Sequence, residues 1–225
     1  MTRFLTGLTL VFVVLLITAT AAPAHADPAN ELTGGSFDRA LRSASANALT
    51  EDNLHGATLA YARRLPLAPL PGLQLWGTAN LGWGVTEGTM FQTLTTEVDT
   101  AQYTFGARAR YALFRDHVVA TARLDLGTQR SAVVLRDEAG HSAADASWGA
   151  VGIGALGVDL LAVTHRRFSL GVRAELGYVA ASAVELTARA ESPADDTLEL
   201  DRMAASLGHL DLGGRYFAVT VVSQF

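Results

Sequence analysis

The sequence predicts an all-β protein, an antiparallel transmembrane β-barrel of eight strands that follows an N-terminal signal peptide. Three observations predict it: segments of alternating apolar and polar residues, an export signal at the start, and a final strand that ends on an aromatic residue. Alternation with a period of two places successive side chains on opposite faces of a strand. Because only alternate residues of a membrane barrel face lipid, such a barrel needs no continuous apolar stretch.

Residues 1–26 have the pattern of a secretory signal peptide. Arg3 supplies the positive charge, residues 4–17 form a mostly apolar run, and Ala24-His25-Ala26 matches the small-x-small pattern that precedes cleavage. We expect cleavage before Asp27, because the apolar run is short for a membrane span. The remaining chain divides into an N-terminal segment with the first strand, 27–53, and the rest of the barrel, 54–225.

The composition excludes several classes of protein. The formal net charge is -5, and every basic side chain other than histidine is an arginine, so no electrostatic footprint for nucleic acid is present. The chain has no cysteine, which excludes a lipid-modified N-terminus, disulfides and thiolate metal sites. No second segment of about 20 apolar residues follows the signal, so a helical membrane protein is excluded.

Five segments alternate cleanly: 72–84, 101–114, 118–128, 148–163 and 168–181. Further strands are expected at 54–64 and from about residue 209 to the end of the chain. One face of each strand is apolar with aromatic residues near its ends, and the other combines small residues with few charges. A soluble sandwich also alternates. The aromatic ends and the small polar faces favour the girdles and the narrow lumen of a membrane barrel.

The connections between the expected strands are of two kinds. Short connections lie at the proline-rich 65–71, at 115–117 and at 164–167, and long polar ones lie at 85–100, 131–147 and 182–208. Membrane barrels keep short turns in the periplasm and long loops outside. The last strand therefore runs inward to a periplasmic Phe225. This orientation requires a bent strand at Gly213-Gly214, where a hairpin turn is the competing interpretation.

The same orientation requires one more strand before residue 54. The available stretch is about 36–49, whose alternation is poor. Its Phe37, Leu41 and Ala44 fit a short helix that begins behind Ser36 equally well. The pattern leaves strand and helix open, and only the parity of strands in a closed barrel favours the strand.

The final strand carries a pattern of its own. Phe217, Val219, Val221 and Phe225 lie on one face, with Ser223 at a position between them. A terminal phenylalanine behind an alternating strand resembles the C-terminal assembly signal of bacterial outer-membrane β-barrels, although Ser223 stands where an aromatic or apolar residue is usual.

With its export signal and its loop asymmetry, nearly all of the mature chain resembles the small outer-membrane barrels of Gram-negative bacteria, the class of the OmpA transmembrane domain, OmpX and OmpW. The resemblance implies a monomer in the cell outer membrane. It also implies outer-membrane lipid, lipopolysaccharide and the barrel-assembly machinery as partners. No functional motif of a particular family accompanies it, so it brings no site residues.

Charged residues on the polar faces are the best functional clue. If residue 115 pairs with 118, Arg108 lies opposite Asp125 and Arg110 lies opposite Arg123. If residue 164 pairs with 168, an acid at 159 lies opposite an arginine at 173. Direct cross-strand neighbours lie about 5 Å apart, within reach of an ion pair. The predicted lumen cluster comprises Arg108, Arg110, Arg123, Asp125, Asp159, Arg173 and Glu175.

A nearly balanced cluster in a narrow barrel indicates a plugged lumen, because an open selective pore usually shows rings of one sign. The sequence thus predicts a barrel with a structural or surface-interaction role. The alternative is a narrow channel or carrier for a small solute, whose lumen arginines bind anions. No catalytic residue, cofactor or metal site is expected. The acidic long loops fit plain solvation, or divalent cations that bridge lipopolysaccharide phosphates.

Overall fold

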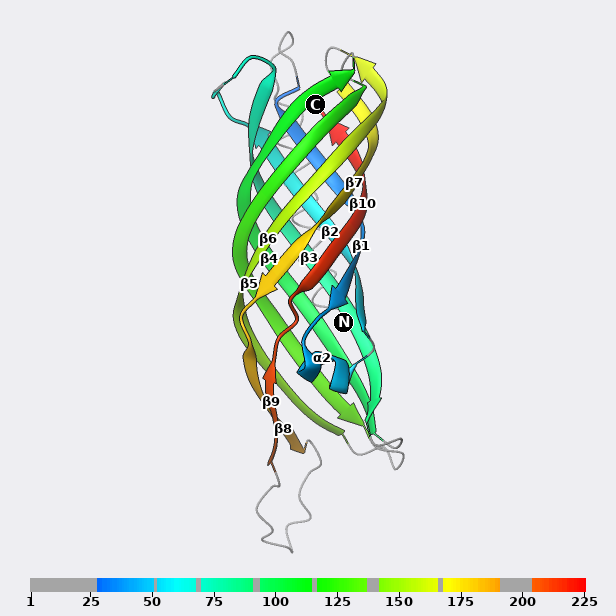
Figure 1. Ribbon diagram of the computed structural model, residues 1–225, viewed down its shortest axis with the longest axis vertical. Helices are drawn as coiled ribbons and strands as arrows, with labels where there is room; N and C mark the ends of the chain where they lie inside the picture. The colour runs from blue at the N-terminus through cyan, green and yellow to red at the C-terminus, as the bar shows by residue number, and fades with distance from the viewer. Residues whose placement is uncertain are drawn as a thin grey trace, which may run out of the picture.

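The computed structural model is a closed antiparallel β-barrel with a short helix at one end (Figure 1). It describes residues 28–50, 52–67, 70–90, 94–114, 117–136, 142–165, 168–190 and 204–225. The expected signal peptide, residues 1–26, lies outside the described residues. No helix in the described part of the chain is long and apolar enough to cross a membrane.

Eight strands form the ring, since each pairs with its neighbour along the chain and the first pairs with the last. The closing pair runs from Glu31 opposite Gln224 to Leu41 opposite Gly214. The predicted antiparallel eight-stranded barrel is therefore confirmed. In ring order its members are β1 (Asn30–Leu41), β2 (Asn53–Arg64), β3 (Leu73–Met90), β4 (Leu94–Phe114), β5 (Val118–Arg136), β6 (Ser142–His165), β7 (Phe168–Ala181) and β10 (Gly214–Gln224).

The predicted strand before residue 54 exists, but its expected bounds are wrong. β1 covers Asn30–Leu41, and the short helix α2 (Ala44–Leu49) follows it, so the two alternatives left open by the sequence occupy successive parts of the segment. The inward face of β1 carries both charge and apolar side chains, from Glu31 to Phe37, Arg39 and Leu41. That mixture removes the alternation from the sequence, whereas pairing with β2 and β10 enforces the strand.

The long polar loops predicted at 85–100 and 131–147 are mostly strand, which corrects the sequence interpretation. β3 and β4 continue as a ladder to Met90 opposite Leu94, and β5 and β6 continue to Arg136 opposite Ser142. A strand needs about 9–11 residues to cross a bilayer, and β6 has 24. The longer strands therefore project well beyond a membrane at the end that carries α2.

The third expected loop, 182–208, also contains strands. β8 (Val184–Ala190) pairs with β9 (Ala204–Leu210) and touches the start of β6, while residues 191–203 lie outside the described residues. β9 and β10 do not form a hairpin: β9 pairs with β8, and β10 pairs with β7 and β1. The competing hairpin is therefore wrong, and the predicted bend in one strand is a break between two, since β9 ends at Leu210 and β10 begins at Gly214.

The two ends of the barrel differ. The final residue, Phe225, lies at the end where β2 leads to β3, β4 to β5 and β6 to β7, at the top of Figure 1; three residues join β4 to β5 and two join β6 to β7. The opposite end carries α2, β8 and β9. With short turns on the periplasmic side, α2 and the β8–β9 pair lie on the cell-surface side.

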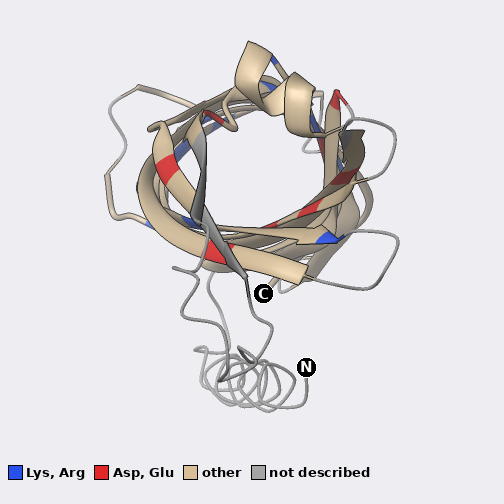
Figure 2. Ribbon diagram, turned by 90° about the horizontal axis from the view of Figure 1, so that it is seen from below, with Lys and Arg blue, Asp and Glu red and all other residues tan. Residues whose placement is uncertain are grey.

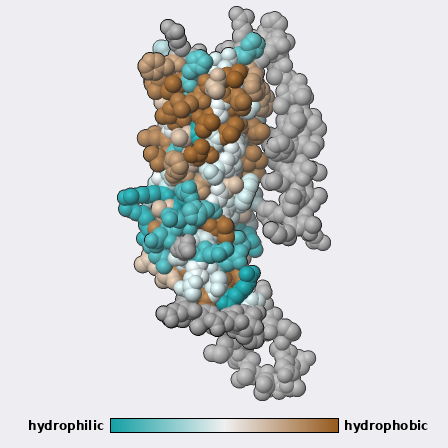
Figure 3. Space-filling view, turned by 90° about the vertical axis from the view of Figure 1, so that its right-hand side faces the viewer, coloured by the Kyte–Doolittle hydropathy of each residue, from teal (hydrophilic) through white to brown (hydrophobic). Residues whose placement is uncertain are grey.

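Exposed apolar side chains of β3 to β7 and β10 form an apolar belt on the part of the barrel nearest to the short turns, and Figure 3 shows one face of it. Beyond it, toward α2, the visible surface is largely hydrophilic. Aromatic side chains lie at both margins: Trp83, Tyr103, Trp148 and Tyr178 toward α2, and Tyr111, Phe114 and Phe168 toward the turns. The belt also includes Phe105, Leu113, Leu124, Leu126, Leu156, Val158, Leu160, Val163, Leu170, Val172, Leu176, Phe217, Val219 and Val221.

Candidate functional site

The structure places all seven predicted lumen residues inside the barrel at the height of the apolar belt. Their relative exposure ranges from 0% for Asp125 and Asp159 to 7% for Arg123. Side chains along a strand point alternately to the lumen and to the outside, and each of these residues occupies a position that points to the lumen. Two further charged residues, Glu31 and Arg39, join them from β1 at 0% exposure. The sequence analysis missed both, because no alternation marked β1 as a strand.

Glu31 is the centre of the charge network. Its Oε1 accepts hydrogen bonds from Arg108 Nη1 at 2.5 Å and from Arg173 Nη1 at 2.8 Å. Its Oε2 lies 3.2 Å from Arg110 Nη1 and accepts a hydrogen bond from Gln224 Nε2 at 3.0 Å. One carboxylate from β1 thus connects β4, β7 and β10 across the lumen, which ties the first and last strands of the ring to its far side.

Asp159 forms the second junction. Arg173 donates to it from Nε at 2.5 Å and from Nη2 at 2.8 Å, and Arg110 Nη2 donates at 3.1 Å. The predicted cross-strand pair of Asp159 and Arg173 is confirmed. The assumed turn was wrong, because His165 pairs with Phe168, and an irregularity between Leu161 and Val163 restores the predicted register.

The predicted register of β4 and β5 is wrong. Arg108 lies opposite Arg123 rather than Asp125, and Arg110 lies opposite Thr121. One residue of this difference arises at the turn, where Phe114 and not residue 115 pairs with Val118, and the second arises between Ala112 and Phe114, where the pairing shifts. The two facing arginines are tolerated because each has a close carboxylate of its own, and Glu175 lies between them, 3.0 Å from Arg123 and 3.9 Å from Arg108. Arg108 bonds to Glu31 in β1, whereas Arg123 has its own acidic partners.

Arg123 holds the third part of the network together. Its guanidinium lies 3.3 Å from Asp125 Oδ2 and 3.0 Å from Glu175 Oε2, and it donates to the hydroxyl oxygen of Tyr216 at 3.4 Å. The other oxygen of Asp125 accepts a hydrogen bond from the hydroxyl of Thr78 at 2.6 Å. Four arginines and four acids thereby form one paired cluster, as buried charges require.

Arg39 lies apart from this cluster. It donates to the side-chain oxygens of Gln102 at 2.7 Å and Gln129 at 3.0 Å, and to the carbonyl oxygen of Leu212 at 3.1 Å. Its guanidinium also lies 5.8 Å from the ring centroid of Phe37. None of the ion pairs among the described residues includes Arg39, so this buried cation is held by neutral oxygens alone.

Beyond Arg39, toward the cell surface, the interior becomes apolar. Inward-facing residues of the projecting strands pack there with two side chains of α2, Ala46 and Leu49. The helix lies at the rim of the ring (Figure 2). The cluster comprises Phe37, Leu41, Ala46, Leu49, Leu54, Val98, Val133, Val151, Ile153, Ala155, Val179, Val184, Leu186, Leu210, Leu212, Tyr216 and Ala218.

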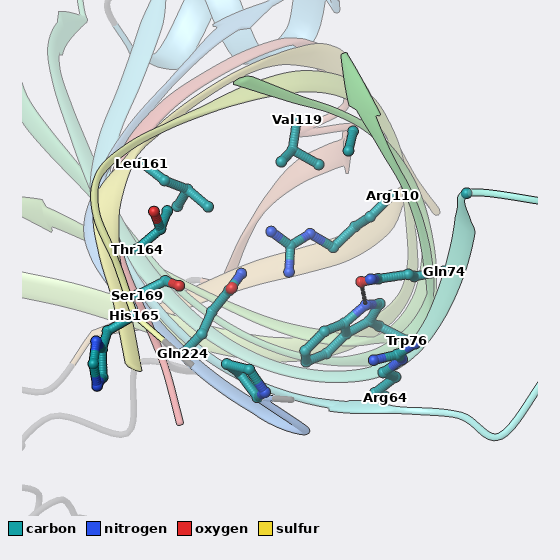
Figure 4. Close-up of a pocket in the computed structure, with 13 residues that line it drawn as sticks. Arg64, Gln74, Trp76, Arg110, Val119, Leu161, Thr164, His165, Ser169 and Gln224 are labelled. Carbon is teal, nitrogen blue, oxygen red and sulfur yellow. Dashed lines mark hydrogen bonds between the residues drawn. The ribbon is translucent and has the colours of Figure 1, made fainter. Parts of the chain in front are cut away.

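A cavity of about 680 Å³ opens at the periplasmic end, which we call the vestibule (Figure 4). Arg110 reaches into it from β4, and its guanidinium lies 5.1 Å from the ring centroid of Trp76. The indole nitrogen of Trp76 donates to Gln74 at 3.3 Å. The lining consists of Pro28, Arg64, Gly72, Gln74, Trp76, Arg110, Ala112, Val119, Leu161, Thr164, His165, Ser169 and Gln224.

No group of three or more potential ligands that could hold a metal ion occurs among the described residues. The residues of the predicted C-terminal assembly signal lie on the outer face: Phe217, Val219 and Val221 are exposed. Phe225 is half-buried, and its backbone exchanges hydrogen bonds with Asn30 at 2.9 and 3.0 Å. Recognition of this strand by the assembly machinery stays a prediction.

The distribution of polarity decides where the barrel is located. At the belt the outer face is apolar and the interior is charged, whereas in the projecting part the outer face is hydrophilic and the interior is apolar. A barrel in lipid needs an apolar outer face, whereas a barrel in water needs a hydrophilic outer face around an apolar interior. The protein is an outer-membrane β-barrel.

Comparisons with known proteins find likeness among solved structures but not among sequences. No protein-family model and no curated protein matches the sequence. Among solved structures, the chain is similar to the outer membrane protein OprG from Pseudomonas aeruginosa, with 10% identity over 89% of this chain and 97% of that chain and a TM-score of 0.49. It is also similar to Ail, the attachment invasion locus protein of Yersinia pestis, with 10% identity over 88% and 97% and a TM-score of 0.43. At such identity the likeness concerns the fold alone.

Proposed function

We propose that the protein is a plugged outer-membrane barrel with a structural or surface-interaction role. The observation that carries the proposal is the filled interior. Within the belt, paired arginines and acids occupy the lumen, and on the cell-surface side the apolar cluster with α2 occupies it. A solute would have to displace both layers, and breaking buried ion pairs costs several kcal/mol.

The projecting strands support a role at the cell surface. β3, β4, β5 and β6 continue past the belt as one ladder around their own apolar core, so they form a firm platform. The outer face of this platform carries acidic side chains at Glu87, Glu97 and Asp99, with Arg136 paired to Glu97 at 3.4 Å. Packed cores keep their shape better than solvated loops, which suits a surface that contacts other molecules.

Lipopolysaccharide and the assembly machinery are the partners that we propose. Two exposed arginines lie beside belt aromatics on the cell-surface side: Arg130 opposite Trp148, and Arg215 opposite Tyr178. Guanidinium groups bind phosphate oxygens well, and aromatic side chains favour the membrane interface. The apolar outer face of β10 supports recognition by the assembly machinery.

The test of the plugged lumen is the conductance of the purified protein in planar bilayers. We expect little or no steady conductance. A large and stable conductance would overturn the proposal and favour the alternative, a narrow channel or carrier. In that case Arg108→Gln and Arg110→Gln should change its ion selectivity, because these arginines would then line the path.

The lipopolysaccharide contact has a separate test. Arg130→Gln combined with Arg215→Gln should reduce the lipopolysaccharide retained on purification, as counted by native mass spectrometry. The matched control is Arg63→Gln, which removes an exposed arginine on the periplasmic side. Equal retention in all variants would reject these two arginines as the contact.

A further inference from the structure

The vestibule has the composition of a binding site for a small anion. Its lining provides guanidinium groups at Arg64 and Arg110, and no carboxylate side chain is among the described residues that line it. We propose that the vestibule binds a small organic anion with a phosphate or carboxylate group, which enters and leaves from the periplasmic side. Its volume, about 680 Å³, lies within the usual range for small-molecule sites.

Arg110 gives the site a fixed positive group at its inner wall. Glu31 and Asp159 hold the two terminal nitrogens of its guanidinium at 3.2 and 3.1 Å, and the ring of Trp76 supports its face. Contacts of this kind keep the side chain in one position, so a ligand does not have to order it. Arg110 therefore presents an ordered cationic wall.

Arg64 provides a second guanidinium group nearer to the mouth. It is half-buried and lies next to Trp76 and Gln74 in Figure 4. Neutral donors complete the lining: the amide of Gln74, the hydroxyls of Thr164 and Ser169, and the amide of Gln224. Arginine with amide and hydroxyl donors is the usual combination around phosphate or carboxylate oxygens.

The interior beyond the vestibule also favours an anion. Among the described residues, five buried guanidinium groups and four buried carboxylates lie in the lumen, and the additional cation is Arg39. This excess of one positive charge lies in a region of low dielectric constant, where charges interact more strongly than in water.

Binding is measured with the folded protein in detergent, by fluorescence and by calorimetry. Trp76 is the reporter, and Trp83→Phe with Trp148→Phe removes the two outward tryptophans, whose side chains are 43% and 57% exposed. The probes are inorganic phosphate and citrate, titrated at constant ionic strength with sodium chloride as the blank. We expect a saturable change with at least one of the two probes, and the stronger response assigns the preferred oxyanion.

Arg64→Gln should weaken this binding about tenfold, the effect of losing one charge-assisted hydrogen bond. Arg64→Lys should restore part of it. The matched control is Arg63→Gln, since Arg63 is adjacent in β2 but exposed on the outer face; it removes the same charge and should leave binding unchanged. Heat-modifiable gel migration confirms that each variant is folded.

Two results would overturn the inference: no saturable response to either probe, or an equal loss in Arg64→Gln and Arg63→Gln. The second result would mean that general surface charge, and not the vestibule, attracts the anion. The inference does not depend on the plugged lumen, because conductance and binding are measured separately. A conducting barrel that binds neither probe would contradict both proposals, and a non-conducting barrel that binds neither contradicts only this one.

Discussion

Glu31→Gln is the sharpest test of the charge network. The substitution keeps the size of the side chain and removes the negative charge that three arginines share. Arg110 and Arg173 retain Asp159, but Arg108 keeps only Glu175, whose Oε1 lies 3.9 Å from its Nη2. Removing one partner from a buried ion pair costs about 3–5 kcal/mol, because the remaining charge stays buried without compensation.

The assay is urea unfolding of the protein folded into lipid vesicles, monitored by tryptophan fluorescence. The midpoint should fall while the slope with denaturant stays unchanged, which marks a loss of stability rather than a change in the unfolded state. Asp38→Asn is the matched control, because Asp38 lies on the same strand with its side chain 54% exposed. An exposed pair such as that of Asp38 with His55 contributes at most about 1 kcal/mol.

The reasoning is refuted if Glu31→Gln and Asp38→Asn lower the free energy of unfolding by amounts within about 1 kcal/mol of each other. A further check is the double variant Glu31→Gln with Arg108→Gln. It should recover part of the loss, because it also removes the uncompensated cation. A double variant that is less stable than Glu31→Gln alone would show that the charge of Arg108 is satisfied by other groups.

Three further outcomes are expected. Gly214→Ala should lower the yield of heat-modifiable barrel, because the added β-carbon would lie 2.0 Å from a backbone carbonyl oxygen of β1. Gly154→Ala is the control and should fold normally, because no atom lies within 4 Å of the position of its β-carbon. Leu49→Ala should lower the free energy of unfolding by about 2–5 kcal/mol, because it removes a buried side chain from the projecting core, and should make the cell-surface end sensitive to added protease. Asn47→Ala, on the exposed side of α2, is the control and should leave resistance to protease unchanged. Equal digestion of both variants would argue against a packed helix. Deletion of Phe225 should slow assembly in cells, read as unfolded protein in the periplasm, and normal assembly would remove its role in recognition.

Much of the barrel follows from the sequence alone. In lipid every backbone polar group must be paired within the protein, so strands must close into a ring. The alternation at 101–114 and 168–181 therefore determined the strands, their inward faces and the burial of Arg108 and Arg173. Even the weakly patterned first strand followed, because the orientation of the last strand left one strand missing.

Register was decided by the tertiary structure. The turn and the shift of the pairing between Ala112 and Phe114 together placed Arg108 opposite Arg123, and the irregularity after Leu161 preserved the pair of Asp159 and Arg173. Turn geometry and bulges set the register of hairpins. Each insertion moves the alternation by one residue. It lies so close to the turn that too few strand residues follow for the change to be recognised in the sequence.

The extent of the projecting strands was also decided by the tertiary structure. In β4 the apolar residues near the membrane, such as Phe105, face outward, whereas beyond the membrane Val98 faces inward. The alternation therefore changes phase where the surrounding solvent changes from lipid to water. Such a change of phase looks like a loop in the sequence, and only the packed core of Val98, Val133 and α2 identifies it as strand.

The sequence by itself determined a closed barrel with a charged lumen, because burial in lipid dictates the face of every side chain. It could not determine that Glu31 joins three arginines or that Arg39 contacts no carboxylate in the described part of the chain. Those features depend on residues far apart in the chain that meet only across the closed lumen. The vestibule likewise brings together side chains from seven of the eight barrel strands, including Arg64, Arg110 and Gln224, which no local pattern connects.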